Sequence, residues 1–341
     1  MSSEKQQQPK PKPKPKRRWF QLRLRTLLVL VTLASVFLGR VGWELDQRRR
    51  EKVAIAWVEE MGGKVSFEAE IDSGLKTNWW KKIADTLLGK SVHSFSLRGD
   101  EVRDLSSLTG LKNLEAIYLY QTNVSDLSPL ADLKKLRKID LQGTRVSDLT
   151  PLSGLKNLRV LVLDRTEVID LSPLAELKKL ERLSLWYTQV SDLSSLAKLK
   201  NLRFIYLNSS PVSDESPLAE LKNLERLSLW YTQVSDLSSL AGLKKLESLD
   251  LNSTQVSDLS PLAGLKNLRF LCLDGTEVSD LSPLAKLGSL SELWLDGIKV
   301  SDLSPLAGLE NLRRLYLDGT KVTEEQIEQL QLALPKCNIS R

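Results

Sequence analysis

Histidine and cysteine are nearly absent from this chain of 341 residues, which has one histidine, His93, and two cysteines, Cys272 and Cys337. Most protein metal sites need several ligands of these types, and most activated nucleophiles need a histidine as their base. The sequence also has no phosphate-binding glycine loop and no nucleophile elbow. These absences predict that the protein is not an enzyme and that it uses no metal and no cofactor.

Aromatic residues are also few, at 6%, whereas hydrophobic residues make up 41% and charged residues 27% of the chain. This composition supplies a large core and is typical of a folded protein. The formal net charge is +6, but it is unevenly distributed. Residues 1–25 contain nine Lys or Arg and one Glu, a net charge of +8, which leaves −2 on the rest. A nearly neutral body argues against nucleic-acid binding.

The N-terminal region divides into a polar tail and an apolar segment. Residues 1–18 are rich in alternating Pro and Lys, so they cannot bury apolar area and are predicted to be a disordered tail. Residues 19–43 follow, and their uncharged stretch, Thr26–Gly39, has 14 residues. A helix of that length spans about 21 Å, less than the roughly 30 Å hydrocarbon core of a bilayer. Trp19 and Trp43, however, stand where interfacial aromatic residues are found.

Three interpretations of residues 19–43 compete: a buried core helix, a cleaved signal peptide and an uncleaved signal-anchor helix. Cleavage would favour an A-x-A-like site, and only the weaker Ala34-Ser35-Val36 is present. We therefore favour the transmembrane anchor. Nine Lys or Arg precede the apolar stretch and five follow closely. This bias predicts a single-pass protein with a cytoplasmic N-terminus and an extracytoplasmic body.

Residues 44–104 are predicted to be a connector and N-terminal cap. Apolar spacing indicates a helix that stops at Gly62-Gly63, and alternation of Val65, Phe67, Ala69 and Ile71 indicates a strand. A second helix is expected over 78–89, capped by Asn78. We expect His93 to be a solvated strand residue, because no second histidine is present to share a metal with it.

A 22-residue repeat covers about two thirds of the chain. Ten units follow one another without insertion or deletion, from 105–126 to 303–324, and Glu215 fills one leucine position. A fixed period of this length predicts a solenoid. The leucines that define the period are Leu105, Leu127, Leu149, Leu171, Leu193, Leu237, Leu259, Leu281 and Leu303.

Each unit can be interpreted from its residues, as in 259–280. Leu271 and Leu273 alternate with Phe270 and Cys272, which predicts a strand with one face inward. The sequence SPLAGL places Ser at an N-cap and Pro at the first helical position, so a short helical turn is expected. A threonine follows each strand and is expected to bond backbone groups of the bend; Ser210 and Ile298 replace it in two units. The threonines are Thr122, Thr144, Thr166, Thr188, Thr232, Thr254, Thr276 and Thr320.

The pattern LxxLxLxxTxV with a 22-residue period resembles the leucine-rich repeat family, in particular its internalin-like bacterial class. The resemblance covers about residues 92–339, with SVHSFSLRGDEV as an opening half-repeat and residues 325–341 as a closing helix and strand. It implies an α/β solenoid with a parallel sheet on the concave side and short helical turns on the convex side. It also implies a binding scaffold, because the family serves unrelated partners. The family usually has Asn where this chain has Thr.

The aromatic residues of the repeats form the candidate partner-binding site. All of them stand outside the Leu/Val core pattern, at positions predicted to face solvent between inward leucines. A contiguous aromatic surface indicates a partner site. Alternatively, aromatic residues pair across strands for stability, and duplication of the nearly identical fourth and sixth units multiplies them. The candidates are Tyr118, Tyr120, Trp186, Tyr187, Phe204, Tyr206, Trp230, Tyr231, Phe270, Trp294 and Tyr316.

Two further features have weaker functional interpretations. Asp274, Asp296 and Asp318 recur at one position and are expected to stack about 5 Å apart, where calcium could bind, although Asp-Gly is also ordinary turn chemistry. Cys272 and Cys337 are expected to lie roughly 14 Å apart, too far for a disulfide, with Cys272 facing outward.

The sequence thus predicts a membrane-anchored interaction module whose concave face binds a protein or peptide. Basic and acidic residues are nearly balanced on that face, so a polyanion such as nucleic acid is not expected. The alternative is a structural envelope or adhesion component that assembles through lateral contacts.

Overall fold

The chain divides into two structural units, Met1–Asp46 and Gln47–Arg341. The computed structural model describes residues 24–67 and 92–341. The predicted tail at 1–18, the aromatic residue Trp19 and the helix expected over 78–89 lie outside the described residues.

The first helix, α1, runs without a break over Leu24–Glu60. The apolar segment and the helix expected after it therefore form one element, not two, and the helix ends at the Gly62-Gly63 pair as the sequence predicts. Its segment Leu27–Glu60 is long and apolar enough to cross a membrane, and none of the most apolar part is buried. That exposure does not favour the interpretation as a buried core helix.

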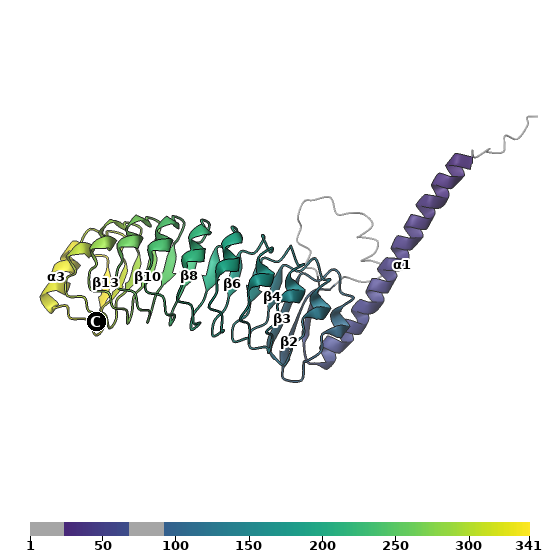
Figure 1. Ribbon diagram of the computed structural model, residues 1–341, viewed down its shortest axis with the longest axis horizontal. Coiled ribbons are helices and arrows are strands. Elements are labelled where there is room, and N and C mark those ends of the chain that lie inside the picture. The colour runs from purple at the N-terminus through teal and green to yellow at the C-terminus, as the bar shows by residue number, and fades with distance from the viewer. Residues whose placement is uncertain (1–23, 68–91) are drawn as a thin grey trace, which may run out of the picture. The chain divides into compact units, whose positions relative to one another are not determined.

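Thirteen strands in the described residues form one sheet whose spatial order follows the sequence (Figure 1). β1 (Lys64–Phe67) pairs antiparallel with β2 (Val92–Gly99), and all later neighbours are parallel. From β3 to β12 each paired residue lies opposite the one 22 positions later, as Leu271 does with Leu293. The remaining strands are β3 (Ala116–Thr122), β4 (Lys138–Asp140), β5 (Val160–Val162), β6 (Arg182–Ser184), β7 (Phe204–Tyr206), β8 (Arg226–Ser228), β9 (Ser248–Asp250), β10 (Phe270–Cys272), β11 (Glu292–Trp294), β12 (Arg314–Tyr316) and β13 (Asn338–Ser340).

Short 3-10 turns alternate with the strands and line the opposite side of the repeats (Figure 1). This confirms the predicted solenoid with a parallel sheet and short helical turns. The turns are η1 (Ser106–Leu108), η2 (Ser128–Leu130), η3 (Thr150–Leu152), η4 (Ser172–Leu174), η5 (Ser194–Lys198), η6 (Ser216–Glu220), η7 (Ser238–Gly242), η8 (Ser260–Gly264), η9 (Ser282–Lys286) and η10 (Ser304–Leu306).

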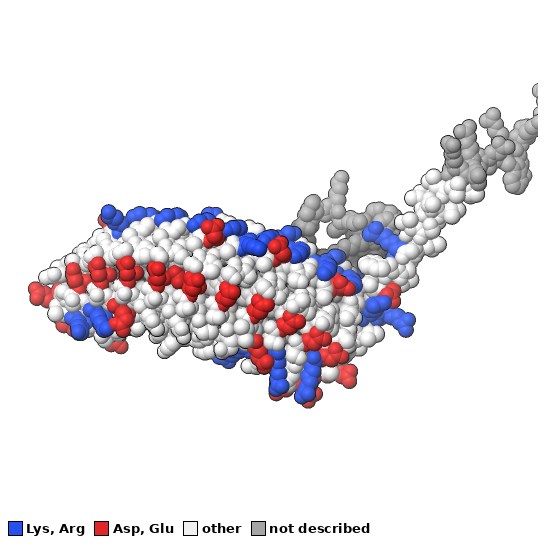
Figure 2. Space-filling model, viewed as in Figure 1, with Lys and Arg blue, Asp and Glu red and all other residues white. Residues whose placement is uncertain are grey.

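The prediction that Ser is the N-cap of these turns is wrong, because in η8 the N-cap is Leu259 and an aspartate just before it binds the first amide of the turn. Ser260 is the first residue of η8, and Asp258 Oδ1 accepts its backbone N–H at 2.8 Å. A carboxylate before a turn satisfies an amide that the turn leaves unpaired. Acidic side chains lie in single file along the repeats in Figure 2. The aspartates in this role are Asp104, Asp126, Asp148, Asp170, Asp192, Asp214, Asp236, Asp258, Asp280 and Asp302.

The core is one continuous ladder of leucines and valines. In the unit 259–280 the side chains of Leu262, Leu268, Leu271 and Val278 are fully buried, and the same positions are buried in the other units. A single unit is too small to enclose these side chains, so stacking on the neighbouring units supplies the burial.

The threonine after each strand bonds the backbone of its own repeat. Thr188 Oγ1 donates to the Leu185 carbonyl at 2.8 Å, and Ser210 makes the equivalent bond to Leu207, so serine does not interrupt this column. Ile298 has no hydroxyl and is buried there instead. Within the described residues Thr122 Oγ1 is buried without a partner, so the prediction is wrong for that threonine.

Both ends of the repeat array are covered. Ala54 and Val58 of α1 are buried in the core at the first end, where β1 pairs with β2. His93 lies half-buried in β2, with its Nδ1 3.8 Å from Glu115 Oε1. At the other end α3 (Glu324–Ala333) and β13 close the array, as the resemblance implies.

Candidate protein-interaction surface

Four outward positions recur in each repeat and form columns across the sheet. In each strand from β4 to β12, the first residue belongs to column 1 and the third residue to column 2. The second residue after the strand belongs to column 3, and the third residue after the strand belongs to column 4. Across β6, β7 and β8 these residues are Arg182, Phe204 and Arg226 in column 1; Ser184, Tyr206 and Ser228 in column 2; Trp186, Asn208 and Trp230 in column 3; and Tyr187, Ser209 and Tyr231 in column 4.

None of the eleven candidate aromatic residues belongs to the buried core. The expectation that all of them lie between inward leucines is wrong for Trp186, Tyr187, Trp230 and Tyr231, which follow the strands in the turns. Trp186, Tyr187 and Tyr231 are the most exposed, at 37%, 50% and 59%, and the other eight are half-buried.

Ring contacts divide these residues into separate groups. Tyr118 stacks on Tyr120 at 6.0 Å near the first end of the array, and Trp294 stacks on Tyr316 at 4.0 Å near the last. Six residues of β6–β8 and their turns lie between these pairs, and we call them the central aromatic group. They are Trp186, Tyr187, Phe204, Tyr206, Trp230 and Tyr231.

The central aromatic group contains two ring pairs, one between neighbouring repeats and one within a single repeat. Trp186 packs edge-on against Tyr206 of the next strand at 6.3 Å, and Trp230 packs against Tyr231 at 5.4 Å. β7 lies between β6 and β8, so Tyr206 lies between the repeats of the two tryptophans. Such pairs fix ring orientation and add stability, so packing accounts for part of this aromatic arrangement.

Column 4 has an unusual backbone conformation that the sequence analysis missed. All nine of its residues have a positive φ, between 53° and 71°. The Tyr187 N–H donates to the Asn208 carbonyl of the next repeat at 2.9 Å, and Tyr231 does the same with Asn252. Glycine adopts this conformation readily, and Gly143, Gly275, Gly297 and Gly319 fill the column elsewhere. A tyrosine is strained there by about 1 kcal/mol.

A polar network orients Trp186. Asp164 Oδ1 accepts the Trp186 backbone N–H at 2.9 Å and the Ser184 hydroxyl at 2.5 Å. With the Asn208 amide oriented to satisfy its neighbours, its oxygen accepts Trp186 Nε1 at 3.2 Å. In the part of the chain that the structure describes, the equivalent Trp230 Nε1 is buried without a hydrogen-bond partner. The two nearly identical repeats therefore hold their tryptophans differently.

Two of the three stacked aspartates in the last repeats accept backbone amides. Asp274 Oδ1 accepts the N–H of Asp296 at 2.8 Å, and Asp296 Oδ1 accepts that of Asp318 at 2.7 Å. Burial is the main cause that raises the pKa of Asp274, and the Asp296 carboxylate raises it further. Among the described residues no group of three His, Cys, Asp or Glu is placed to hold a metal ion. Turn chemistry thus explains this column.

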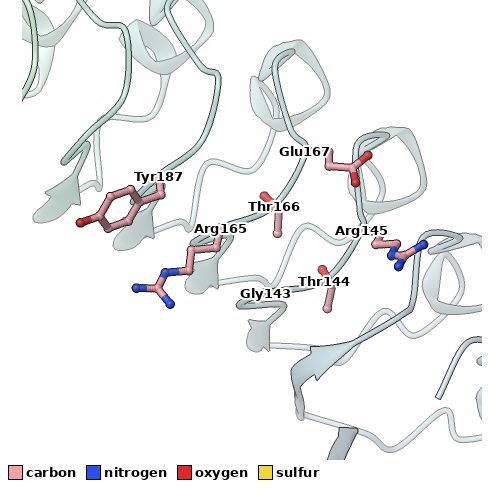
Figure 3. A pocket seen from close by; sticks show the side chains of 7 residues that line it. All are labelled: Gly143, Thr144, Arg145, Arg165, Thr166, Glu167 and Tyr187. Atoms are coloured by element: carbon pink, nitrogen blue, oxygen red, sulfur yellow. The ribbon is translucent and has the colours of Figure 1, made fainter. Parts of the chain in front are cut away.

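A shallow depression lies beside column 4 (Figure 3). Gly143, Arg145, Arg165, Glu167 and Tyr187 line it, and Arg165 stacks on the Tyr187 ring at 5.3 Å. The two hydroxyls in its wall both donate to backbone carbonyls, Thr144 to Leu141 and Thr166 to Leu163. These hydroxyls are therefore engaged in the fold.

Both cysteines are free thiols. Cys272 occupies an outward position, column 2, as predicted, but it is buried there between Asp250 and Trp294. Burial raises the pKa of both Cys272 and Cys337, which makes them poorly reactive.

Comparison with known proteins agrees with this geometry. A family model for leucine-rich repeats in two copies matches residues 134–176, 178–220 and 222–264. An internalin (inlF) from Listeria monocytogenes has a similar structure, with 30% sequence identity and a TM-score of 0.63, over 73% of this chain and 79% of that one. The chain belongs to the leucine-rich repeat family, in its internalin-like class.

Other leucine-rich repeat structures share the fold. A leucine-rich repeat protein of Leptospira interrogans is 21% identical with a TM-score of 0.56, over 69% of this chain and 74% of that one. A plant peptide hormone receptor, RGFR1, in complex with RGF2, is also 21% identical with a TM-score of 0.59, over 72% of this chain and 42% of the receptor. No curated protein matches the chain. Leucine-rich repeats generally serve as non-enzymatic scaffolds for protein interaction.

Proposed function

We propose that this leucine-rich repeat protein is a membrane-anchored interaction module whose central aromatic group binds a protein or peptide on the concave face. One observation carries the proposal. Tyr187 and Tyr231 are half or more exposed in a backbone conformation where four other repeats have glycine. Strain of this kind is typical of functional positions, because folding alone favours the glycine.

The scaffold is suited to binding with little loss of entropy. Parallel strands in strict register fix the backbone beneath the central aromatic group, and its ring pairs restrict the side chains. Preorganised tyrosine and tryptophan side chains are typical binding hot spots. Cross-strand stabilisation accounts for Tyr206, which contacts Trp186, but it does not account for two exposed tyrosines in strained turns.

Photo-crosslinking tests this surface in cells that contain the full-length chain. A photoreactive residue placed at Tyr187 or Tyr231 is expected to crosslink a partner, whereas the same residue at Lys156 is the matched control. Lys156 is exposed and lies between η3 and β5. Equal crosslinking from Lys156 and from the tyrosines would support the alternative of lateral assembly and contradict binding by the central aromatic group.

The anchor and its orientation are a second part of the proposal. The unburied apolar part of α1 supports a single-pass anchor, and the Lys/Arg bias supports an extracytoplasmic repeat domain. Because both native thiols are buried, a Lys156→Cys variant introduces one reactive cysteine. A membrane-impermeant maleimide is expected to label this variant, but not the parent protein, on intact cells. Labelling only after cell lysis would contradict the orientation.

A further inference from the structure

Two arginines on the concave face are held against one aromatic ring. Arg182 on β6 and Arg226 on β8 are the register neighbours of Phe204 on β7, and their guanidinium carbons lie 4.8 Å and 5.9 Å from its ring centre. Adjacent strands are about 4.8 Å apart, so the two arginine backbones are separated by about 10 Å. Cation–π contact orders the long side chains before any ligand arrives.

These two guanidinium groups are not neutralised within the described chain. Arg203 also faces Phe204, but Glu225 binds it through two hydrogen bonds of 2.7 Å. Glu181 pairs with Arg159. In the residues that the structure describes, Arg182 and Arg226 are exposed, and their guanidinium groups have neither a hydrogen bond nor a carboxylate within ion-pair distance.

Arg314, which lies in the same column, is neutralised by a carboxylate. It is the column-1 residue of β12, and its Nη1 lies 3.1 Å from Glu292 Oε2 on the neighbouring strand. The neighbours of Arg182 and Arg226 in the same column, Val160, Phe204 and Ser248, carry no charge. The sheet therefore presents two free positive charges beside the central aromatic group.

We propose that β6–β8 bind an acidic segment of a partner protein, with its side-chain carboxylates at Arg182 and Arg226 and its apolar residues against Trp186, Tyr206 and Trp230. This rests on the proposed function and names the chemistry of the partner. Ordered, planar guanidinium groups recognise carboxylates with good geometry. A long polyanion fits less well, because Glu181 and Glu225 already neutralise the neighbouring Arg159 and Arg203, which leaves few free positive charges along these strands.

A random dodecapeptide display library, selected on the full-length protein in nanodiscs, is the probe. The wild-type protein is expected to enrich peptides that combine Asp or Glu with aromatic or aliphatic residues. A synthetic selected peptide and its Glu→Gln form are then titrated against wild type, the R182Q/R226Q variant and the R314Q control. All three substituted side chains are exposed, and thermal melting confirms that each variant folds.

We expect R182Q/R226Q to weaken binding of the acidic peptide about three- to tenfold, the range for two exposed charge pairs. R314Q is expected to leave binding unchanged, and the Gln peptide is expected to bind wild type and R182Q/R226Q equally.

Two outcomes contradict the inference, and they are distinguishable. If the selected peptides bind R182Q/R226Q as well as wild type, or if the selection does not enrich acidic residues, the two arginines do not bind carboxylates. Either result leaves the proposed function standing. The same selection is also run on a W186S/Y206S/W230S variant. If the wild-type protein enriches no peptides that this variant does not also enrich, the result contradicts the proposed function as well.

Discussion

The Glu215 carboxyl group accepts a hydrogen bond of 2.7 Å from the Ser239 hydroxyl. Glu215 occupies the position where the nine other repeats have leucine. Glu215 is 4% exposed, so its carboxyl is enclosed in the leucine core. Ser239 bonds one carboxyl oxygen and stands where most repeats have proline. Burial raises the pKa of Glu215.

A Glu215→Leu substitution is therefore expected to stabilise the protein at neutral pH. A raised pKa means that the folded state holds the proton more tightly than the unfolded state, so wild-type stability falls as pH rises from about 4.5 towards the folded pKa. The gain from leucine is about 1–3 kcal/mol at pH 7 and smaller at pH 4. Urea denaturation at both pH values measures it. If the gain in unfolding free energy does not increase with pH, the pKa of Glu215 is not raised by burial.

An Asp126→Ala substitution is expected to destabilise the repeats modestly. Asp126 Oδ1 accepts the Ser128 N–H at 2.8 Å, and hydrogen bonds from Ser128 lower the pKa of this carboxyl. The stabilisation is present above the unfolded pKa of about 3.8 and is lost as pH falls through the lower folded pKa. We expect a loss of about 0.5–1 kcal/mol at pH 7, at the lower end for caps because the group is exposed.

Asp126→Asn is the matched control, since its amide oxygen keeps the acceptor without the charge. Denaturation curves should show wild type and the Asn variant converging in acid. Identical stability of wild type and the Ala variant at pH 7 would show that the aspartates before the 3-10 turns do not stabilise these turns.

Tyr231→Gly and Tyr231→Ala separate strain from side-chain packing. Both remove the contact with Trp230, but only alanine retains the Cβ that makes φ +55° unfavourable. The glycine variant is expected to be more stable than the alanine variant by about 1 kcal/mol. Thermal and urea unfolding compare the two. An alanine variant as stable as the glycine variant would mean that column 4 relaxes to an ordinary backbone.

Phe substitutions of the two column-3 tryptophans are expected to differ. Trp186→Phe removes the bond to Asn208 and leaves its amide oxygen without that donor, at a cost of about 1–2 kcal/mol beyond the packing loss. Trp230→Phe removes an N–H that has no partner in the described structure, so it is expected to cost less. Urea denaturation of both variants measures the difference. Equal losses would contradict the different networks.

The period of the leucines was sufficient to predict the fold. The lattice of 22 residues and the buried Val278 position fix strand register and core, because any slip would move leucines to the surface. The caps were misassigned because Ser260 and Asp258 are both good capping residues, and only coordinates show which one bonds. The burial of Cys272 depends on its neighbour Trp294 in the next repeat, so it could not be predicted from the sequence of one unit.

The candidate surface was predicted less completely. The aromatic residues could be found by elimination from the core pattern, but their division into three groups depends on ring orientation across repeats. The strained column was visible in principle, since Tyr187 and Tyr231 align with Gly275 and Gly297 on the lattice. The free charge of Arg182 and Arg226 could not be found from the sequence, because their own repeats also contain acidic residues and the pairing of these charges depends on geometry.

Binding by the central aromatic group is tested most directly by comparing two triple variants of the full-length chain. W186S/Y206S/W230S removes rings from this group, and Y118S/Y120S/Y316S removes three rings elsewhere on the same face. Crosslinked partner is measured for each after thermal melting confirms folding. We predict that the first variant loses the partner and the second retains it. Retention by the first, or equal loss by both, would contradict the account.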